Sequence, residues 1–132
     1  RELREKGCEV LAIPGPSAVI SALSVSGLAT DRFTFFGFLP KSDVRREKLL
    51  NQYKELDSTL VFYESPNRLL KLLELIQRIL GDCNVTVARD ISKMREQYFF
   101  GKVGKIIEEI NQNDFESNPH GEYVVMVENK RD

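Results

Sequence analysis

The sequence predicts an α/β domain in which a mixed, mostly five-stranded sheet lies between two layers of helices, a three-layer α/β/α architecture. Short apolar or aromatic runs alternate along the chain with longer segments of helical periodicity. Residues 59–63 form a continuous apolar run, as expected for a central strand that is covered on both faces. Short connections near the end of the chain favour a sheet that contains both parallel and antiparallel pairs.

The first third of the chain combines a predicted strand, a rigid turn and a helix. Residues 10–13 form the strand, and Gly15 follows between two prolines that fix the backbone on either side of it. Ser17 is placed to cap a helix over residues 17–26, whose inward face is formed by Val19, Ile20, Ala22 and Leu23. Phe33–Phe38 is aromatic-rich and alternating, which predicts a second strand.

Two helices flank the central strand in the sequence. A charged helix is predicted over about residues 43–56. After the strand, Ser65 is a helix cap and Pro66 occupies the first helical position, so a helix runs from there to Leu80 and ends at Gly81. Its apolar face consists of Leu69, Leu72, Leu73, Ile76, Ile79 and Leu80.

The last third supplies the remaining strands. Asn84–Arg89 and Gln97–Lys102 are predicted strands, and residues 123–128 close the sheet. A short amphipathic helix lies between the last two of these strands, and its apolar residues are Val103, Ile106, Ile107 and Ile110.

Composition narrows the class of protein. The 132 residues are 42% hydrophobic and 30% charged with a net charge of −1, so the chain can bury one core and has no overall basic field. Two cysteines and one histidine do not form a metal-ligand spacing, and we expect no metal site. No apolar run is long enough to span a bilayer and no signal peptide is visible, so we expect a cytoplasmic protein with reduced thiols.

The start of the chain has the composition of a helix end. It begins with Arg1 rather than Met, and Gly7 follows a charged segment in the position of a helix terminator. We expect residues 1–9 to be the end of an inter-domain helix with its linker. Residues 10–132 would then be a C-terminal domain whose N-terminal partner domain is absent from this chain.

Several short motifs follow one another along the sequence. They are Pro14-Gly15-Pro16-Ser17-Ala18, Ser26-Gly27-Leu28-Ala29-Thr30-Asp31-Arg32-Phe33, Phe36-Gly37-Phe38-Leu39-Pro40-Lys41, Tyr63-Glu64-Ser65-Pro66-Asn67-Arg68, Val87-Ala88-Arg89-Asp90-Ile91-Ser92-Lys93 and Gly121-Glu122-Tyr123-Val124-Val125. In this order and spacing the chain resembles the C-terminal half of the tetrapyrrole-methylase superfamily. More narrowly, it resembles the bacterial branch that 2′-O-methylates a cytidine ribose of small-subunit ribosomal RNA.

The resemblance implies a function and a cofactor site. S-adenosylmethionine would bind in the cleft between this domain and the absent one. The family's contacts match Ser17 and Ala18 in the turn, Tyr63 or Glu64 at the end of the central strand, and Ala88 in the next strand. The resemblance also implies a homodimer. Since half of the cleft is missing, we expect no methyl transfer from this chain alone.

Two charged groups near the central strand have alternative explanations. Arg68 lies in the first turn of a helix, where the macrodipole opposes a positive charge. It either forms a surface pair with Glu64 or binds a phosphate.

The catalytic base is not identified by the sequence. A ribose hydroxyl must be aligned for attack on the methyl group and relieved of its proton. Lys93 and Glu96 are the candidates in this half, and the alternative is that the two form a structural ion pair. The family usually has a second carboxylate after Glu96, where this chain has Gln97.

Basic residues that could contact RNA lie in three places. Lys41, Arg45 and Arg46 cluster at a predicted helix start, and Arg68 and Arg89 follow the two strands described above. Cations of this kind engage phosphates, although a solvated helix face is the alternative for the cluster.

Two other functions remain open at this stage. One is methylation of a tetrapyrrole or of a protein side chain by another member of the superfamily. The other is a non-catalytic dimerisation or docking module. The motifs around Phe36 and Tyr63 favour the ribosomal RNA branch.

Overall fold

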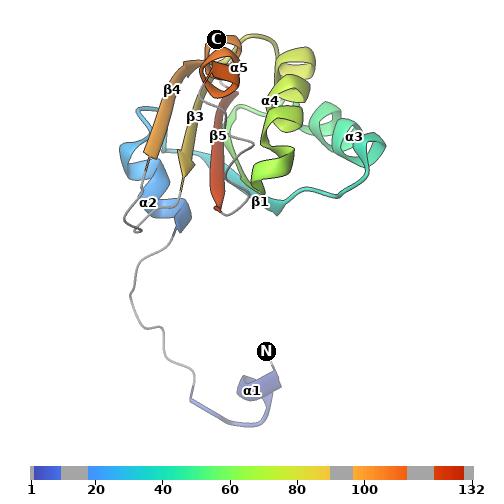
Figure 1. The fold of residues 1–132 in the computed structure, drawn as a ribbon. Coiled ribbons are helices and arrows are strands. Elements are labelled where there is room, and N and C mark those ends of the chain that lie inside the picture. The colour runs from blue at the N-terminus through green and yellow to red at the C-terminus, as the bar shows by residue number, and fades with distance from the viewer. Residues whose placement is uncertain (1, 10–17, 90–96, 113–120, 130–132) are drawn as a thin grey trace.

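The computed structural model describes residues 2–9, 18–89, 97–112 and 121–129 (Figure 1). The strand predicted at 10–13 and the turn that follows it lie outside the described residues. Five strands form one sheet in the spatial order β1-β2-β5-β3-β4. Their bounds are Phe33–Phe38 (β1), Ser58–Glu64 (β2), Asn84–Arg89 (β3), Gln97–Lys102 (β4) and Tyr123–Asn129 (β5).

The sheet is mixed, as the sequence predicted. β1 pairs with β2 in parallel, while the pairs β2–β5, β5–β3 and β3–β4 are antiparallel. The strands β1, β2 and β3 therefore end at the same side of the sheet, at Phe38, Glu64 and Arg89, and β5 and β4 begin there. We call this side the carboxyl edge.

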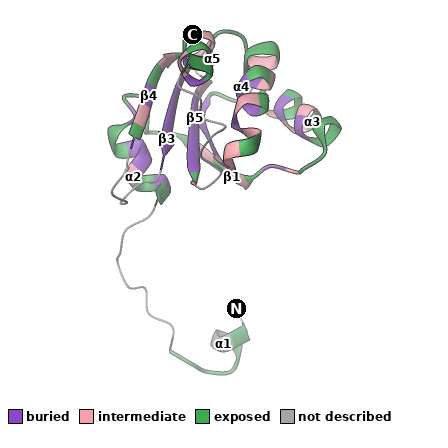
Figure 2. Cartoon of the chain, viewed as in Figure 1, coloured by how far each residue is buried: buried purple, intermediate pink, exposed green. Residues whose placement is uncertain are grey.

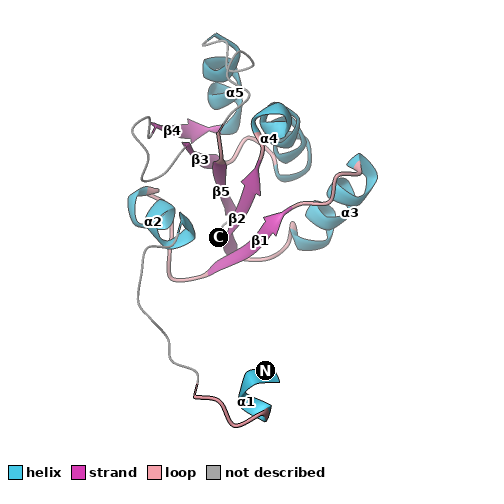
Figure 3. Ribbon diagram, turned by 60° about the horizontal axis from the view of Figure 1, so that its bottom comes forward, coloured by secondary structure: helices cyan, strands magenta, loops and turns pink. Residues whose placement is uncertain are grey.

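Helices cover the sheet unequally (Figure 3). The helices α3 (Asp43–Tyr53), α4 (Pro66–Leu80) and α5 (Val103–Gln112) pack on one face, which we call the closed face. On the other, which we call the open face, lies α2 (Ala18–Val25). The described part of the chain also contains a four-residue helix, α1 (Glu2–Glu5). The sheet thus has helices on both faces, which confirms the three-layer prediction.

The larger core lies on the closed face. Alternate residues of the central strands point into it, including Leu60 and Phe62 of β2, and they meet the predicted apolar face of α4. In Figure 2 the inner strands β3 and β5 are purple and therefore buried, whereas the edge strand β4 is partly pink and green. The fully buried large side chains of this core include Leu60, Phe62, Leu69, Leu72, Leu73, Ile76, Ile106 and Tyr123.

The core on the open face is smaller. Val19, Ala22 and Leu23 of α2 pack against a row of sheet residues formed by Val61, Ala88, Val124 and Met126. Thr86 Oγ1 donates a hydrogen bond of 2.8 Å to the Ser26 carbonyl, which ties the end of α2 to β3. The prediction that Ile20 faces inward is wrong, because this side chain is 55% exposed.

A bulge in β1 brings two of its phenylalanines, Phe35 and Phe38, to the same face of the sheet. The pairing with β2 shifts between Phe35 and Gly37, and Gly37 has a φ of 65°, which a residue without Cβ adopts without strain. As a result Phe35 and Phe38, three residues apart, both contact Tyr63 on the open face, while Phe36 packs on the closed face.

Helix boundaries agree closely with the sequence prediction. α4 begins at Pro66 and is terminated by Gly81 with a φ of 87°, as predicted. α3 ends at Tyr53 rather than near Leu56, where the amide of Leu56 donates to the Tyr53 carbonyl and turns the chain toward β2. None of the helices in the described ranges has the length and hydropathy that crossing a bilayer requires.

Candidate functional site

A single row of residues crosses all five strands near the carboxyl edge. Register pairs Phe38 with Tyr63, Tyr63 with Val124, Val124 with Ala88, and Ala88 with Tyr98. Because neighbours in a row point to the same face of a sheet, these side chains share the open face, beside α2. The row therefore brings together Tyr63 and Ala88, two residues that the sequence placed in a cofactor site.

A pocket of ≈ 200 Å³ opens above this row. It is lined by Ala18, Phe38, Tyr63, Glu122, Tyr123 and Val124. Ala18 and Tyr63 were predicted here, whereas the contributions of Phe38 and of the start of β5 were not. The motif that begins at Gly121 marked this strand start in the sequence, but the sequence could not show that it lies beside β2.

Tyr63 is the centre of an aromatic cluster on the pocket wall. Its ring lies 4.9 Å from that of Phe35 in an edge-to-face contact and 5.5 Å from that of Phe38. Phe38 is 64% exposed, so a broad apolar surface faces solvent beside the pocket. Rings held in this way offer flat faces on which a planar ligand can stack.

Two other predicted cofactor contacts have different positions. Ala88 is fully buried in the open-face core and its strand is paired on both sides, so its side chain packs inside the domain. Ser17 lies outside the described residues.

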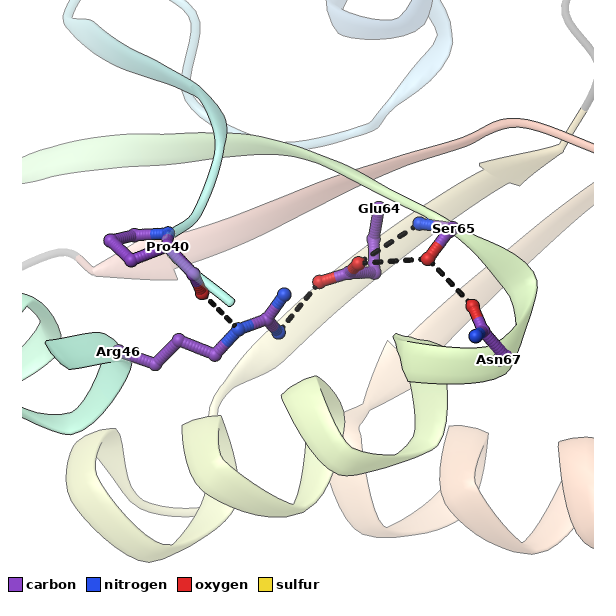
Figure 4. Close-up of polar contacts among 5 residues, drawn as sticks. All are labelled: Pro40, Arg46, Glu64, Ser65 and Asn67. Carbon is purple, nitrogen blue, oxygen red and sulfur yellow. Dashed lines mark hydrogen bonds and ion pairs between the residues drawn. The ribbon is translucent and has the colours of Figure 1, made fainter. Parts of the chain in front are cut away.

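Glu64 belongs to the opposite side of the sheet. It follows Tyr63 in β2, so its side chain points to the closed face, where it is 3% exposed. Its carboxylate accepts a 2.8 Å hydrogen bond from a guanidinium nitrogen of Arg46 and a 2.9 Å bond from the Ser65 amide (Figure 4). Arg46 in turn donates through Nε to the Pro40 carbonyl at 2.6 Å. The carboxylate thus has protein partners, and a cofactor contact through it is not what this geometry favours.

This pair corrects two predictions. Arg46 is 5% exposed, so it is not part of an exposed basic cluster as predicted. The surface pair considered between Glu64 and Arg68 is also replaced, because the partner of Glu64 is Arg46. A sequence cannot show this readily, since the two residues are 18 positions apart on different elements. Two buried opposite charges need each other, because either one alone would keep its desolvation penalty.

Arg89, another cation predicted to contact RNA, is also buried. It ends β3 in the same row as Tyr123, and its guanidinium lies over the Tyr123 ring, 5.9 Å from the ring centre. At 9% exposed, this side chain belongs to the interior of the domain rather than to its surface.

The remaining predicted cations are accessible. Lys41 and Arg45 are exposed, and Arg68 is half-buried. Lys41 and Arg68 line one groove of ≈ 240 Å³ together with Asp43, Arg46, Asn67 and Lys71. Lys71 was missed in the sequence because it lies on the polar side of an amphipathic helix, where lysines are common.

The candidate bases, Lys93 and Glu96, lie outside the described residues. In the ranges that are described, no three His, Cys, Asp or Glu side chains come together as metal ligands would.

Comparison with known proteins places this architecture in a family. A family model for the tetrapyrrole (corrin/porphyrin) methylases matches residues 1–107. Ribosomal RNA small subunit methyltransferase I of Thermotoga maritima is 40% identical over 129 residues, which cover 98% of this chain and 56% of that protein. The protein of the same name from Escherichia coli O157:H7 is also 40% identical, over 97% of this chain and 44% of its own length. The chain thus spans about half the length of the curated relatives it matches.

Solved structures show the same fold at lower identity. A cobalt precorrin-4 methyltransferase of cobalamin biosynthesis has a TM-score of 0.59 at 14% identity, over 96% of this chain and 54% of that chain. The methyltransferase CobJ has a TM-score of 0.58 at 19% identity, over 94% and 52%. With a family model that matches most of its residues, this chain belongs to the tetrapyrrole (corrin/porphyrin) methylases.

Proposed function

We propose that this chain is the C-terminal half of an S-adenosylmethionine-dependent methyltransferase that 2′-O-methylates a cytidine ribose of small-subunit ribosomal RNA. The observation that carries the proposal is the pocket at the carboxyl edge, where Ala18 and Tyr63 meet. Open α/β sheets bind ligands at the ends of their strands. The relatives' name, ribosomal RNA small subunit methyltransferase I, supports the substrate.

The size and lining of the pocket support a shared cleft. At ≈ 200 Å³ it falls below the roughly 300–1,000 Å³ of a complete small-molecule site. The missing wall would come from the part of the relatives' length that this chain does not cover. The aromatic rings of Phe38 and Tyr63 would hold the adenine, and the Glu122 carboxylate lies where a ribose hydroxyl could donate to it.

The bound cofactor would supply the methyl group, and the protein must prepare the acceptor. A ribose hydroxyl reacts well only when it is held in line with the methyl group and loses its proton. We keep Lys93 and Glu96 as the candidate bases for that proton. We also infer a cytoplasmic homodimer acting on the small ribosomal subunit.

Calorimetric titration of S-adenosylhomocysteine tests the cleft directly. We expect tight binding to the full-length protein and weak binding to this chain. Phe38→Ala in the full-length protein should weaken binding about threefold to tenfold, the value of one aromatic stacking contact. Phe100→Ala is the matched control, because Phe100 is another exposed phenylalanine but lies on the far edge strand, β4. Equal loss in both variants, or comparable binding to the isolated chain, would contradict a shared pocket at this edge.

Methyl transfer to the small ribosomal subunit tests the reaction. Nucleoside analysis of the product should show methylation on the ribose of a cytidine rather than on a base. The isolated chain should show no turnover. Binding of S-adenosylhomocysteine without any transfer by the full-length protein would favour the docking module instead.

A further inference from the structure

The groove between the loop after β1 and the start of α4 has a strongly biased charge. Its lining consists of four cations, one carboxylate and one amide: Lys41, Arg46, Arg68, Lys71, Asp43 and Asn67. The whole chain, by contrast, has 19 basic and 20 acidic residues. We call this the cationic groove. Such a concentration of positive charge in a near-neutral chain attracts anions locally.

Three of these cations have no side-chain partner among the residues that the structure describes. Within the described residues, no ion pair or side-chain hydrogen bond involves Lys41, Arg68 or Lys71. Arg46, at the edge of the groove, is paired with Glu64. Among the described residues that line the groove or pair with its cations, only Asp43 and Glu64, the partner of Arg46, carry negative charge.

A neighbouring groove between α3 and α4 differs from the cationic groove in its charge. It is lined by Asp43, Arg46, Glu47, Lys71, Glu74, Leu75 and Arg78, so acidic and basic residues balance there. Arg78 also makes two hydrogen bonds to the Glu47 carboxylate, at 3.1 and 3.3 Å. The unbalanced charge is thus confined to the end of α4 that lies at the carboxyl edge.

The N-terminal turn of α4 is a second feature of the groove that favours an anion. Ser65 occupies the cap position but its side chain makes no capping bond, and its hydroxyl donates to the Asn67 side chain at 2.8 Å. The first turn contains no acidic residue. The helix dipole therefore favours a negative group at this end, and Arg68 lies in the turn where the dipole otherwise opposes a cation.

The ends of β1 and β2, and the residues that follow them, line both the cationic groove and the cofactor pocket. Phe38 lines the pocket and Lys41, three residues later, lines the groove. Even a fully extended chain places their Cα atoms at most about 11 Å apart. Likewise Tyr63 lines the pocket, and Asn67 and Arg68 line the groove just after it. A molecule that reaches one site is therefore close to the other.

We propose that the cationic groove binds a phosphate of the RNA backbone beside the modified ribose, through Lys41, Arg68 and Lys71. This rests on the proposed function. The anchored phosphate would orient the strand so that the ribose reaches the pocket on the other face of the sheet.

Salt-dependent binding of a fluorescent fragment of small-subunit ribosomal RNA to the full-length protein tests the groove. Arg68→Glu and Lys71→Glu should each weaken binding and reduce the slope of log K against log salt by about one. Lys102→Glu is the matched control: Lys102 is also exposed, but it lies at the opposite edge of the sheet, paired with the first residue of β3. It should leave the slope unchanged.

The Arg68→Glu variant distinguishes a loss of RNA binding in the groove from a loss of folding stability. The substitution replaces a cation in the first turn of α4 with a carboxylate, which the helix dipole favours there, so the melting temperature should stay the same or rise. A loss of RNA binding in this variant cannot then be attributed to unfolding. Wild-type binding by both groove variants, or an equal loss in Lys102→Glu, would overturn the proposal.

Two further arms identify the ligand and isolate the proposed function. Inorganic phosphate alone should shift the amide resonances of Asn67 and Arg68 only weakly, and an effect as strong as that of RNA would indicate a free-phosphate site and overturn the RNA assignment. Titration of S-adenosylhomocysteine into Arg68→Glu should match the wild type. If RNA binding depends on the groove while no methyl transfer is found, the groove stands and the proposed reaction fails.

Discussion

The two faces of the sheet use the same strands for different purposes. On the closed face three helices bury a continuous core, and Phe62, Leu72, Leu73 and Ile76 are fully buried. On the open face the described part of the chain places one two-turn helix, α2, over part of the sheet, and Phe35 and Phe38 are 46% and 64% exposed. The closed face holds most of the apolar burial that stabilises the fold, whereas the open face keeps apolar surface available at the carboxyl edge.

Two consecutive residues of β2 show how sharply the division is made. The pleat of the strand turns Tyr63 toward the pocket and Glu64 toward Arg46. Glu64 also accepts a hydrogen bond from the Ser65 amide, so the same carboxylate fixes the point where β2 becomes α4. The hydrogen bonds of Glu64 on the closed face thus fix the end of β2, and this also holds Tyr63 at the pocket on the open face.

Removing Arg46 should have the largest effect. Arg46→Ala leaves the Glu64 carboxylate buried without its cation, so the free energy of unfolding should fall by about 3–5 kcal/mol. Urea denaturation measures this loss. Charge reversal at Arg46 should be at least as harmful, so it cannot report on RNA binding.

Arg45→Ala is the control for that substitution. Arg45 is the preceding residue of α3 but is exposed, so its removal should change stability by less than about 0.5 kcal/mol. Similar stability of the two variants would show that the pair with Glu64 contributes little to the closed face.

Opposite effects are expected from two neighbouring phenylalanines of β1. Phe36 stacks on Phe62 at 5.0 Å and meets Tyr53 at 5.0 Å on the closed face, so Phe36→Ala should cost roughly 2–4 kcal/mol. Phe35 is 46% exposed and contacts Tyr63 on the open face, so Phe35→Ala should cost about 1 kcal/mol or less. Thermal unfolding of both variants measures the difference, and a reversed order would mean that the assignment of the faces is wrong.

The order and boundaries of the elements could be predicted because they depend on local patterns. The Ser65-Pro66 start and Gly81 end of α4, and its apolar face, are encoded within a few residues. The two-sided burial of β2 could likewise be inferred from its apolar run. The family motifs then placed Ala18 and Tyr63 near one another.

Features that depend on tertiary contacts could not be predicted. The pairing of Arg46 with Glu64 requires that α3 pack beside the end of β2, and the burial of Arg89 requires Tyr123 from a distant strand. The bulge of β1 had a local signal, because a glycine inside an aromatic strand often marks one. The sequence did not show, however, that the bulge brings Phe35 and Phe38, three residues apart, to the same face.

The smallest effect concerns a thiol that reports on the closed face. Cys83 packs against its core, and burial raises the pKa of the Cys83 thiol to about 11. At pH 8 only about one such thiol in a thousand is then ionised, so Cys83 should react with a disulfide reagent far more slowly than the exposed Cys8.

The raised pKa of Cys83 also predicts how stability depends on pH. Because burial opposes the charged form of the thiol, its contribution to the free energy of unfolding should be fully present below pH 9 and should be lost as the pH rises toward 11. In Cys83→Ala the alkaline loss should be smaller, as measured by denaturation across this range. Rapid labelling of Cys83 at pH 8 in the folded protein would show that the closed face opens more readily than its packing indicates.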